Sequence, residues 1–508
     1  MQKEILIEQR PGQIRMAVLE DHQLVEYDVE RERFEGLTGN LYKGRVLNVL
    51  PGMQAAFVDI GLGKNAFLYA GDIAVNPSDL QFGSKGKVEV TAELSAKPIQ
   101  KLVHAGQEIL VQVTKEPGGN KGPRVTTHVT LPGRLAVLMP MDAFIGVSRK
   151  IEAEEAREAL RERAEAVCPA GMGLIVRTAG AQCEQEALAR DVEYLSHVWQ
   201  KIERKARQVT APALLHREES LLHRVARDML TDDVACCMLD AETAYHALYD
   251  TVSLLAPTQR SCVQLYRGER PLFDFYGIEE KTEKALERKV WLKSGGYLVI
   301  DTCEALTAID VNTGKFVGKQ DFSETVFAVN REAAAEIARQ LRLRDLGGII
   351  IIDFIDMELA AQRDTILETM RTALRKDRAK TNVVGFTGLG LLEMTRKKLH
   401  APLHTLLKRT CPICHGEGRL LTEETVARRI LQVLMRKAAA GQSGPWVVEA
   451  EEAAVRQLCA LGCPAQVEAY AICAVAKGQD VYTVTAVERT GVPDAARRIP
   501  TEAEGAAE

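Results

Sequence analysis

The stretches Leu306-Thr-Ala-Ile-Asp310-Val-Asn312 and Ile349-Ile-Ile-Ile-Asp353-Phe354 are short apolar runs that both reach an aspartate. Runs of this length and composition predict buried strands. A carboxylate at a strand end is held by a rigid scaffold at an open edge. Around these runs, strands alternate with helical patterns at about 323–345 and 363–377. The region from residue 291 to 402 is therefore predicted to form an α/β layer.

The two aspartates predict a magnesium site. Mg²⁺ prefers hard oxygen ligands, usually one or two carboxylates with waters and substrate phosphates. Asn312 follows Asp310 by two residues, so its amide lies on the same side if the strand continues. The substrate would then be a phosphate ester. The alternative stays open, because an aspartate after a strand is often only a turn former or a helix cap.

Length and composition limit the class of protein. A chain of 508 residues is too long for one core, so about three to five units are expected. The sequence contains no run of eighteen or more apolar residues and no signal-peptide layout, so we expect a cytoplasmic protein that does not span a membrane. Eleven cysteines, an odd number, do not form a secreted disulfide framework. A net charge of -5 excludes a uniformly basic coat for nucleic acid.

Residues 39 to about 131 show short alternating strands broken by Gly and Pro, which predicts a small β-barrel. Phe57 and Phe67 lie on adjoining strands, and exposed aromatics of this kind stack on unpaired bases. The two rings could instead belong to the core of the barrel. Basic residues that could hold a nucleic-acid backbone are Lys43, Arg45, Lys64, Lys115 and Lys121. Before the barrel, two strand-like runs at 4–8 and 14–19 are expected to pair with a later part of the chain.

Arg149 and the pair Arg177-Thr178 could form an anion pocket, since guanidinium groups grip phosphate oxygens and a hydroxyl adds a donor. Surface arginines in ordinary ion pairs are the alternative. Helical patterns cover about 152–166, 181–235 and 422–439, and strands are predicted near Trp446 and Val467. The Ala- and Glu-rich tail is predicted to be disordered.

Cys411-Pro-Ile-Cys414-His-Gly-Glu-Gly418 has the layout of a zinc knuckle. One knuckle supplies two ligands, and the sequence has no second C-x-x-C. His415 or the pair Cys459 and Cys463 could complete the site, or two chains could each donate a pair. A redox pair is the alternative, although no βαβ start precedes it.

Taken together, these motifs resemble those of the ribonuclease E/G family of bacterial endoribonucleases. The resemblance runs to about residue 490. Its segments are Gly39-Asn-Leu-Tyr-Lys-Gly-Arg-Val, Ala55-Ala-Phe-Val-Asp, Gly119-Asn-Lys-Gly, Val137-Leu-Met-Pro, Gly173-Leu-Ile-Val-Arg-Thr-Ala-Gly, Asp310-Val-Asn-Thr-Gly, Ile352-Asp-Phe-Ile-Asp-Met and Cys411-Pro-Ile-Cys.

The resemblance implies a multidomain α+β architecture. A split RNase H-like subdomain would be interrupted by an S1-type (OB-fold) barrel and a 5′-end sensor, and followed by a DNase I-like catalytic subdomain. The implied boundaries are 1–36 and 221–285 for the RNase H-like subdomain, 37–130 for the barrel, 131–220 for the sensor, 286–402 for the catalytic subdomain, 403–420 for a zinc link, 421–495 for a small dimerisation domain and 496–508 for a disordered tail.

The resemblance also implies roles for single residues. Asp310 and Asp353 would hold Mg²⁺, and Asn312 would orient the scissile phosphate or its water. Cys411 and Cys414 would share one Zn²⁺ with a second chain, in a homodimer or homotetramer. The residues implied to bind single-stranded RNA are Phe57, Phe67, Lys115 and Lys121. Those implied to recognise a 5′-monophosphate are Gly133, Val137, Arg149, Arg177, Thr178 and Lys380.

The implied reaction is hydrolysis of single-stranded, A/U-rich RNA to 5′-phosphate and 3′-hydroxyl ends, in ribosomal RNA maturation or messenger RNA decay. Lys380 departs from the family pattern, which has an arginine there, so 5′-end sensing is expected to be weaker. No long arginine- and proline-rich tail follows, so membrane attachment and a large assembly are not expected. The rival function is a non-catalytic RNA-binding or ribosome-assembly factor.

Overall fold

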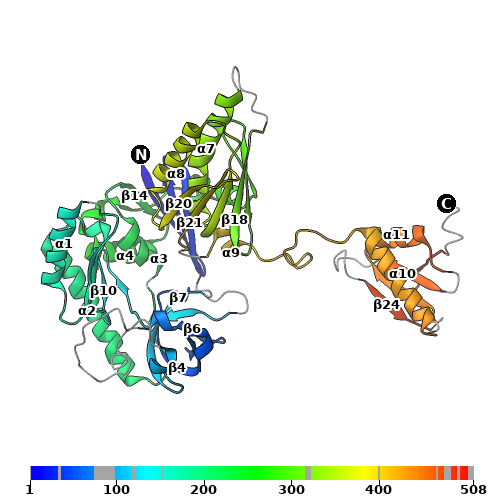
Figure 1. Cartoon of the computed structure of the whole chain (residues 1–508), viewed down its shortest axis with the longest axis horizontal. Coiled ribbons are helices and arrows are strands. Elements are labelled where there is room, and N and C mark those ends of the chain that lie inside the picture. Colours follow the sequence, from blue (N-terminus) through cyan, green and yellow to red (C-terminus); the bar gives the residue numbers. More distant parts are fainter. Residues whose placement is uncertain are drawn as a thin grey trace. The chain divides into compact units, whose positions relative to one another are not determined.

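The computed structural model describes residues 2–31, 36–73, 98–116, 121–151, 153–218, 220–314, 322–398, 401–442, 444–464, 467–473, 482–488 and 492–500. The chain divides into two compact units, Met1–Leu406 and Leu407–Glu508 (Figure 1). Among the residues just given, four sheets lie in the first unit and one lies in the second. Among the described residues, no helix has both the length and the apolar character needed to cross a bilayer.

The amino-terminal strands pair with a much later part of the chain. The first sheet has the order β15-β14-β1-β2-β3. Its strands are β1 (Lys3–Arg10), β2 (Gln13–Glu20), β3 (Gln23–Arg31), β14 (Val234–Leu239) and β15 (Val263–Leu265). β1 and β14 run parallel, so the expected later partner exists. The sequence predicted two amino-terminal strands and missed β3, in which the residues from Glu26 to Arg31 are only partly buried.

Short helices pack on this first sheet. They are α3 (Leu221–Arg224), a π-helical turn (Val225–Met229), α4 (Glu242–Leu255), α5 (Leu272–Phe275) and α6 (Ile278–Ala285). Ile5, Ile7 and Val18 from the strands share a core with Leu248 and Val252 from α4.

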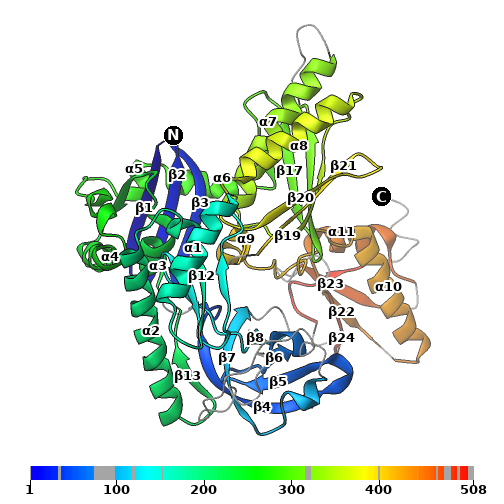
Figure 2. The same cartoon turned by 60° about the vertical axis from the view of Figure 1, so that its left-hand side comes forward.

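A closed barrel follows. Its strands are β4 (Leu41–Leu50), β5 (Ala55–Asp59), β6 (Ala66–Tyr69), β7 (Glu108–Lys115) and β8 (Arg124–Thr126), with β13 (Ala213–His216) added beside β4. A pairing between β4 and β7 closes it (Figure 2). Single 3₁₀ turns lie at Pro51–Met53, Ala70–Asp72 and Ile99–Lys101. The barrel that the sequence predicted is therefore present.

A smaller sheet follows, with strand order β11-β12-β10-β9. Its elements are β9 (Leu131–Pro132), β10 (Ala136–Met139), β11 (Ile145–Val147), α1 (Glu154–Val167), β12 (Gly173–Val176), a 3₁₀ turn (Thr178–Gly180) and α2 (Gln185–Gln208). The predicted helix over 181–235 is interrupted between α2 and α3, and helical structure ends with the π-helical turn at Met229. Pro212 cannot continue a helix, and the next residues instead form β13 on the barrel.

The fourth sheet carries the two aspartates and has the order β16-β17-β18-β19-β21-β20. Its elements are β16 (Lys289–Trp291), β17 (Tyr297–Thr302), β18 (Leu306–Asn312), α7 (Phe322–Leu343), β19 (Gly348–Asp353), α8 (Ala360–Leu374), β20 (Thr381–Phe386), β21 (Leu391–Arg396) and α9 (Leu403–Leu407). Helices α7 and α8 lie together on one side of this sheet (Figure 1). The predicted α/β layer is confirmed.

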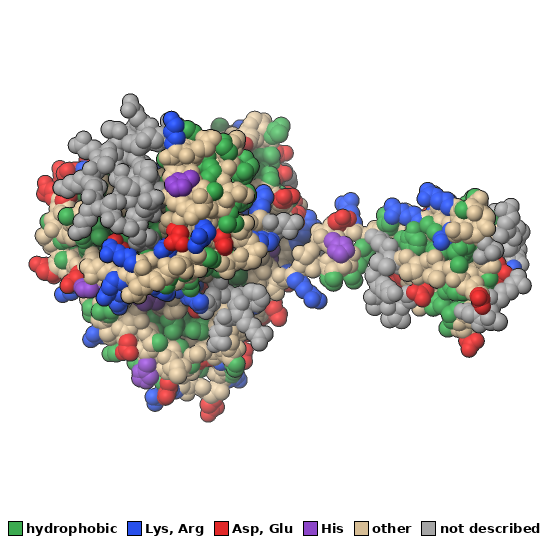
Figure 3. Space-filling view, turned by 90° about the horizontal axis from the view of Figure 1, so that it is seen from below, with side chains coloured by type: hydrophobic (Ala, Val, Ile, Leu, Met, Phe, Trp, Pro, Cys, Tyr) green, Lys and Arg blue, Asp and Glu red, His purple; other side chains and the backbone are tan. Residues whose placement is uncertain are grey.

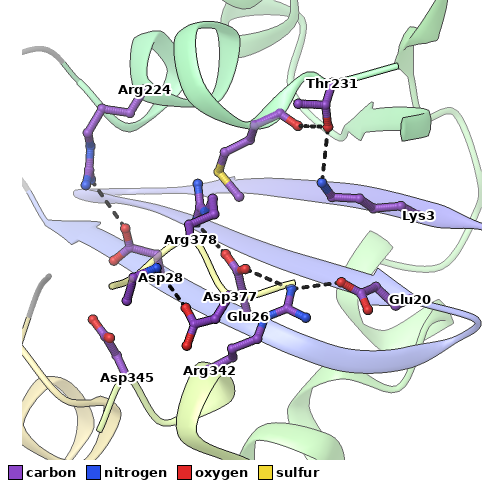
Figure 4. Close-up of polar contacts among 12 residues, drawn as sticks. Lys3, Glu20, Glu26, Asp28, Arg224, Thr231, Arg342, Asp345, Asp377 and Arg378 are labelled. Atoms are coloured by element: carbon purple, nitrogen blue, oxygen red, sulfur yellow. Dashed lines mark hydrogen bonds and ion pairs between the residues drawn. The ribbon is translucent and has the colours of Figure 1, made fainter. Parts of the chain in front are cut away.

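An ion-pair network joins the first sheet to this α/β layer. Arg342, near the end of α7, donates to Glu20 at 2.8 Å and to Glu26 at 3.0 Å (Figure 4). Arg378 also pairs with Glu26. Burial alone would raise the pKa of Glu26, but Arg378 and Arg342 lower it overall. These contacts fix the α/β layer against β2 and β3.

The second unit is a small α+β fold with strand order β24-β22-β23-β25. Its elements are α10 (Glu423–Ala439), β22 (Trp446–Ala450), α11 (Glu452–Leu461), β23 (Ala469–Cys473), β24 (Thr483–Ala486) and β25 (Arg497–Arg498). β25 pairs with β23, and Ile499 is buried in the core. The predicted disordered tail therefore begins too early at residue 496, and residues 501–508 lie outside the described residues.

Candidate functional site

The two aspartates predicted to bind a metal lie side by side. β18 and β19 run parallel, and Asp310 is the direct cross-strand partner of Asp353. Both side chains are exposed, and the amide of Asn312 donates a 2.7 Å hydrogen bond to Asp310. Directly opposed residues point to the same face of a sheet, so the two carboxylates share one patch of surface.

Alternation along the strands aims these side chains outward. Ile309 and Val311 flank Asp310, and Ile352 precedes Asp353; all three are buried against α7 and α8. Side chains alternate between the two faces of a strand, so the buried neighbours leave the aspartates on the open face. A shift of either strand by one residue would bury its carboxylate and expose its apolar side chains, which the apolar pattern disfavours.

The electrostatics and the donor set of this patch fit a divalent cation. Burial raises the pKa of Asp353, and the charges of Asp310 and Asp356 raise it further. A bound cation would relieve that repulsion, and the carboxylate and amide oxygens are hard ligands. Within the described ranges, no three His, Cys, Asp or Glu side chains converge as metal ligands. A metal here would therefore take waters or substrate phosphates as its other ligands.

Asn330 on α7 is a positioning residue that the sequence reasoning missed. Its side chain accepts from the backbone N–H of Ile355 at 3.1 Å and donates to the carbonyl of Ile355 at 2.7 Å. Asn330 is fully buried and clamps the chain two residues after Asp353. The sequence offered one signal for this role, since Asn330 is a polar amide on the apolar face of a predicted helix.

The predicted RNA-binding residues form a row across the barrel. Phe57 and Phe67 are cross-strand partners, with ring centroids 6.1 Å apart in an edge-to-face arrangement. Phe67 pairs with Arg124, and Arg124 pairs with Lys115. Both rings are half-buried and Lys115 is exposed. The sequence analysis missed Arg124, because the pairing of β6 with β8 joins distant segments and cannot be predicted from the residues around Arg124.

Lys121 lies beside this row. The next residue, Gly122, packs so closely that a Cβ there would come within 1.9 Å of the Asn65 carbonyl oxygen. Basic side chains also gather across the middle of the larger unit in the face seen in Figure 3.

Lys43 does not belong to this surface, contrary to the interpretation of the sequence, and the partly exposed Arg45 is held in an ion pair. Lys43 is buried, and its ammonium contacts the carbonyls of Ala206 and Val209 and the carboxylate of Glu108. Arg45 pairs with Glu108 as well. Lys43 therefore fixes the end of α2 to the barrel, and Arg45 fixes the segment before β13 through the carbonyl of Ala211.

The predicted 5′-phosphate residues meet around the turn before β10. Arg177 donates to the carbonyl of Gly133 and pairs with Asp228 at 2.6 Å. A side chain at position 133 is excluded, because its Cβ would come within 2.5 Å of Asp191. The Asp191 carboxylate accepts from the backbone N–H groups of residues 134, 135 and 136. Asp191 and Asp228 are thus two supports that the sequence reasoning missed.

The remaining residues of this set lie on neighbouring segments. The hydroxyl of Thr178 is 3.1 Å from that of Ser148, which directly precedes the exposed Arg149. Lys150 donates to the carbonyl of Asp377 at 3.2 Å, which places the segment of Lys380 next to that of Arg149. Val137 lies on β10, half-buried, and pairs with Pro132 and Ile175.

Cys411 is exposed and Cys414 is half-buried. Backbone hydrogen bonds from Cys414 and Ile413 lower the pKa of Cys411, which favours the thiolate that a metal needs. Cys463 is fully buried in the core of the small unit and is part of no group of three possible metal ligands among the described residues. Within the described residues no third ligand joins the pair, so these residues fit half of a four-coordinate site.

Comparison with known proteins gives consistent matches. The model of the "Ribonuclease E/G family" matches residues 130–399. The chain is 43% identical to Ribonuclease G of Escherichia coli K12 over 458 residues, which cover 90% of this chain and 92% of that protein. Identity to Ribonuclease G of Haemophilus influenzae is 44%, with 85% and 87% covered. Identity to Ribonuclease E of the same organism is 38%, with 84% of this chain and 45% of that protein covered. The chain therefore belongs to the ribonuclease E/G family.

Proposed function

We propose that this chain is a magnesium-dependent endoribonuclease. It cuts single-stranded, A/U-rich RNA into 5′-phosphate and 3′-hydroxyl ends, and a 5′-monophosphate stimulates it. Membership of the ribonuclease E/G family makes the chain an endoribonuclease. The metal, the products and the stimulation are our proposal, as are a cytoplasmic location and a role in ribosomal RNA maturation or messenger RNA decay.

The register of Asp310 with Asp353 carries the proposal. Asp310 and Asp353 would hold Mg²⁺, which would supply charge neutralisation and lower the pKa of a bound water. The chain's own groups hold the geometry. Asn312 donates a hydrogen bond to Asp310, so its amide would lie next to the scissile phosphate. A protein that only binds RNA has no need for this arrangement.

The barrel row would bind the RNA strand. Phe57 and Phe67 offer ring faces to unpaired bases, and Lys115 and Lys121 hold phosphates. Arg124 extends the same row and belongs to this proposal. Its guanidinium pairs with Asp72 at 2.6 Å.

The 5′-end pocket would contain Gly133, Val137, Arg149, Arg177, Thr178 and Lys380. Asp228 and the carbonyl of Gly133 hold the Arg177 guanidinium in place. A preformed guanidinium can grip a phosphate at two points, whereas Lys380 contributes a single ammonium.

Replacing Arg177 with alanine should reduce the preference for 5′-monophosphorylated over 5′-hydroxylated RNA by roughly tenfold, the value of one charge-assisted hydrogen bond. The measurement is the ratio of kcat/KM for the two RNAs. Arg177→Lys should keep part of the preference. Arg161→Ala, which removes an exposed arginine from α1, is the matched control. A parent-like ratio in Arg177→Ala would contradict the pocket.

We also propose that Cys411 and Cys414 share one Zn²⁺ with the same pair of a second chain, giving a homodimer or homotetramer. The parent should then contain about half a zinc ion per chain, because four thiolates from two chains surround one ion. Cys411→Ser should lose the zinc and give a smaller assembly, as measured by elemental analysis and light scattering. Cys303→Ser, at another exposed cysteine, should change neither. One zinc per chain in a monomer would contradict sharing, and a zinc-free parent would favour a redox pair.

A further inference from the structure

Three side chains beside the aspartates have no role in the reaction proposed above. Trp291 is 61% exposed and makes an edge-to-face contact with Tyr297, with centroids 5.4 Å apart. The ammonium of Lys289 lies 3.5 Å from the ring centre of Tyr297 and 4.1 Å from that of Trp291. These three residues form an aromatic cluster with one positive charge.

The sheet register places this cluster beside the two aspartates. Trp291 pairs with Tyr297, and Tyr297 pairs with Asn312. In the next row, Lys289 pairs with Val299, and Val299 pairs with Asp310. Directly opposed residues share a face, and neighbouring strands lie about 4.8 Å apart. Tyr297 is therefore one strand from Asn312, and Trp291 is two.

Packing does not account for the exposed tryptophan. The chain has three tryptophans, and the other two, Trp199 and Trp446, are only 4% and 3% exposed. The inner face of β16 and β17 packs through Val290 and Leu298 instead. Trp291 thus presents a large aromatic surface to solvent on the open face of the sheet.

We propose that Trp291, Tyr297 and Lys289 form a subsite that stacks a base of the RNA next to the scissile phosphate. This proposal rests on the function proposed above. Stacking on an aromatic ring tolerates every base, and a flanking cation holds the phosphate. The subsite therefore adds affinity close to the metal and keeps the strand in line with Asp310 and Asp353. A second copy of the chain is less favoured as the occupant, since the cluster is continuous with the carboxylate patch.

Fluorescence tests the subsite without relying on cleavage. A short single-stranded RNA, added to the full-length protein without magnesium, should quench the fluorescence of the parent, because a base covers Trp291. The two buried tryptophans should contribute little to that change. Trp291→Phe should lose the quenching while it keeps a stacking ring. Equal quenching in Trp291→Phe and the parent would overturn the proposal.

Kinetics test the position of the subsite. Trp291→Ala should raise KM roughly tenfold with a smaller change in kcat, as expected for a lost stacking contact. An abasic nucleotide next to the cleaved bond should raise the parent's KM similarly. In Trp291→Ala the same nucleotide should raise KM little further, because both changes remove the same stacking contact. Phe275→Ala, which removes another exposed ring at the end of α5, is the matched control and should leave KM unchanged.

The outcomes separate the subsite from the function. If Asp310→Asn abolishes cleavage but Trp291→Ala keeps the parent's KM and its response to the abasic nucleotide, the function stands and the subsite is wrong. If Asp310→Asn cleaves like the parent, the proposed function is wrong, and the quenching experiment alone judges the subsite. If Trp291→Ala changes the mass of the assembly and leaves KM unchanged, the cluster is a contact between chains and the proposal is overturned.

Discussion

Asparagine at position 310 or 353 should lower the rate of RNA cleavage at least about a thousandfold. Each carboxylate would help to hold the metal, and the metal's stabilisation of the transition state is worth several kcal/mol. Asparagine keeps the shape of the side chain and removes its charge. Substitution at position 310 also removes one of two adjacent like charges, so the fold should not lose stability. RNA binding through the barrel should stay close to the parent value.

The measurement is cleavage of a 5′-monophosphorylated, single-stranded A/U-rich oligonucleotide in Mg²⁺, with binding measured in parallel. Asp301→Asn is the matched control, since Asp301 lies on the same face of β17 but pairs with Ala308, away from the carboxylates. It should cleave like the parent. A parent that binds RNA without cutting it would favour the RNA-binding or ribosome-assembly function and make the two aspartates structural.

Arg396→Ala should destabilise the larger unit by about 3–5 kcal/mol, the usual cost of leaving one partner of a buried ion pair alone. Arg396 is 3% exposed, and Asp377 is 2% exposed. The Arg396 guanidinium donates to both carboxylate oxygens of Asp377, at 2.7 and 3.2 Å, and also to Asp345. It therefore ties the end of β21 to the segments that follow α7 and α8.

The check is the midpoint of urea unfolding of the larger unit. Arg288→Ala, which breaks an exposed pair with Asp301 on the same sheet, should not move the midpoint measurably. The backbone N–H of Ala379 donates to Asp377 at 2.9 Å, so the loop that carries Lys380 depends on the same carboxylate. A folded Arg396→Ala protein should also show a weaker 5′-end preference. An unchanged midpoint would mean that Asp377 finds another partner or water.

Local pattern was enough for much of this fold. The apolar runs before Asp310 and Asp353 are strands, and α7, α8 and α10 lie close to their predicted bounds. The barrel lies in the region where short alternating strands broken by Gly and Pro predicted it. Each of these features depends on neighbours within a few residues. The helix prediction missed the break after residue 208 because the helix-prone residues Ala213, Leu214 and Leu215 follow Pro212, whereas pairing with the barrel makes this segment a strand.

What the sequence by itself determined was which residues could do chemistry: two aspartates on buried strands, ring-bearing barrel strands and a cysteine pair. The tertiary structure alone decided which of them meet. Asp310 faces Asp353, and Phe67 faces Arg124, only because strands distant in sequence pair in one register. It also removed Lys43 from the proposed RNA-binding surface, through contacts with the end of α2. The physical reason is that side-chain alternation is a local property of the backbone, whereas strand pairing follows from burying a whole sheet face against its helices.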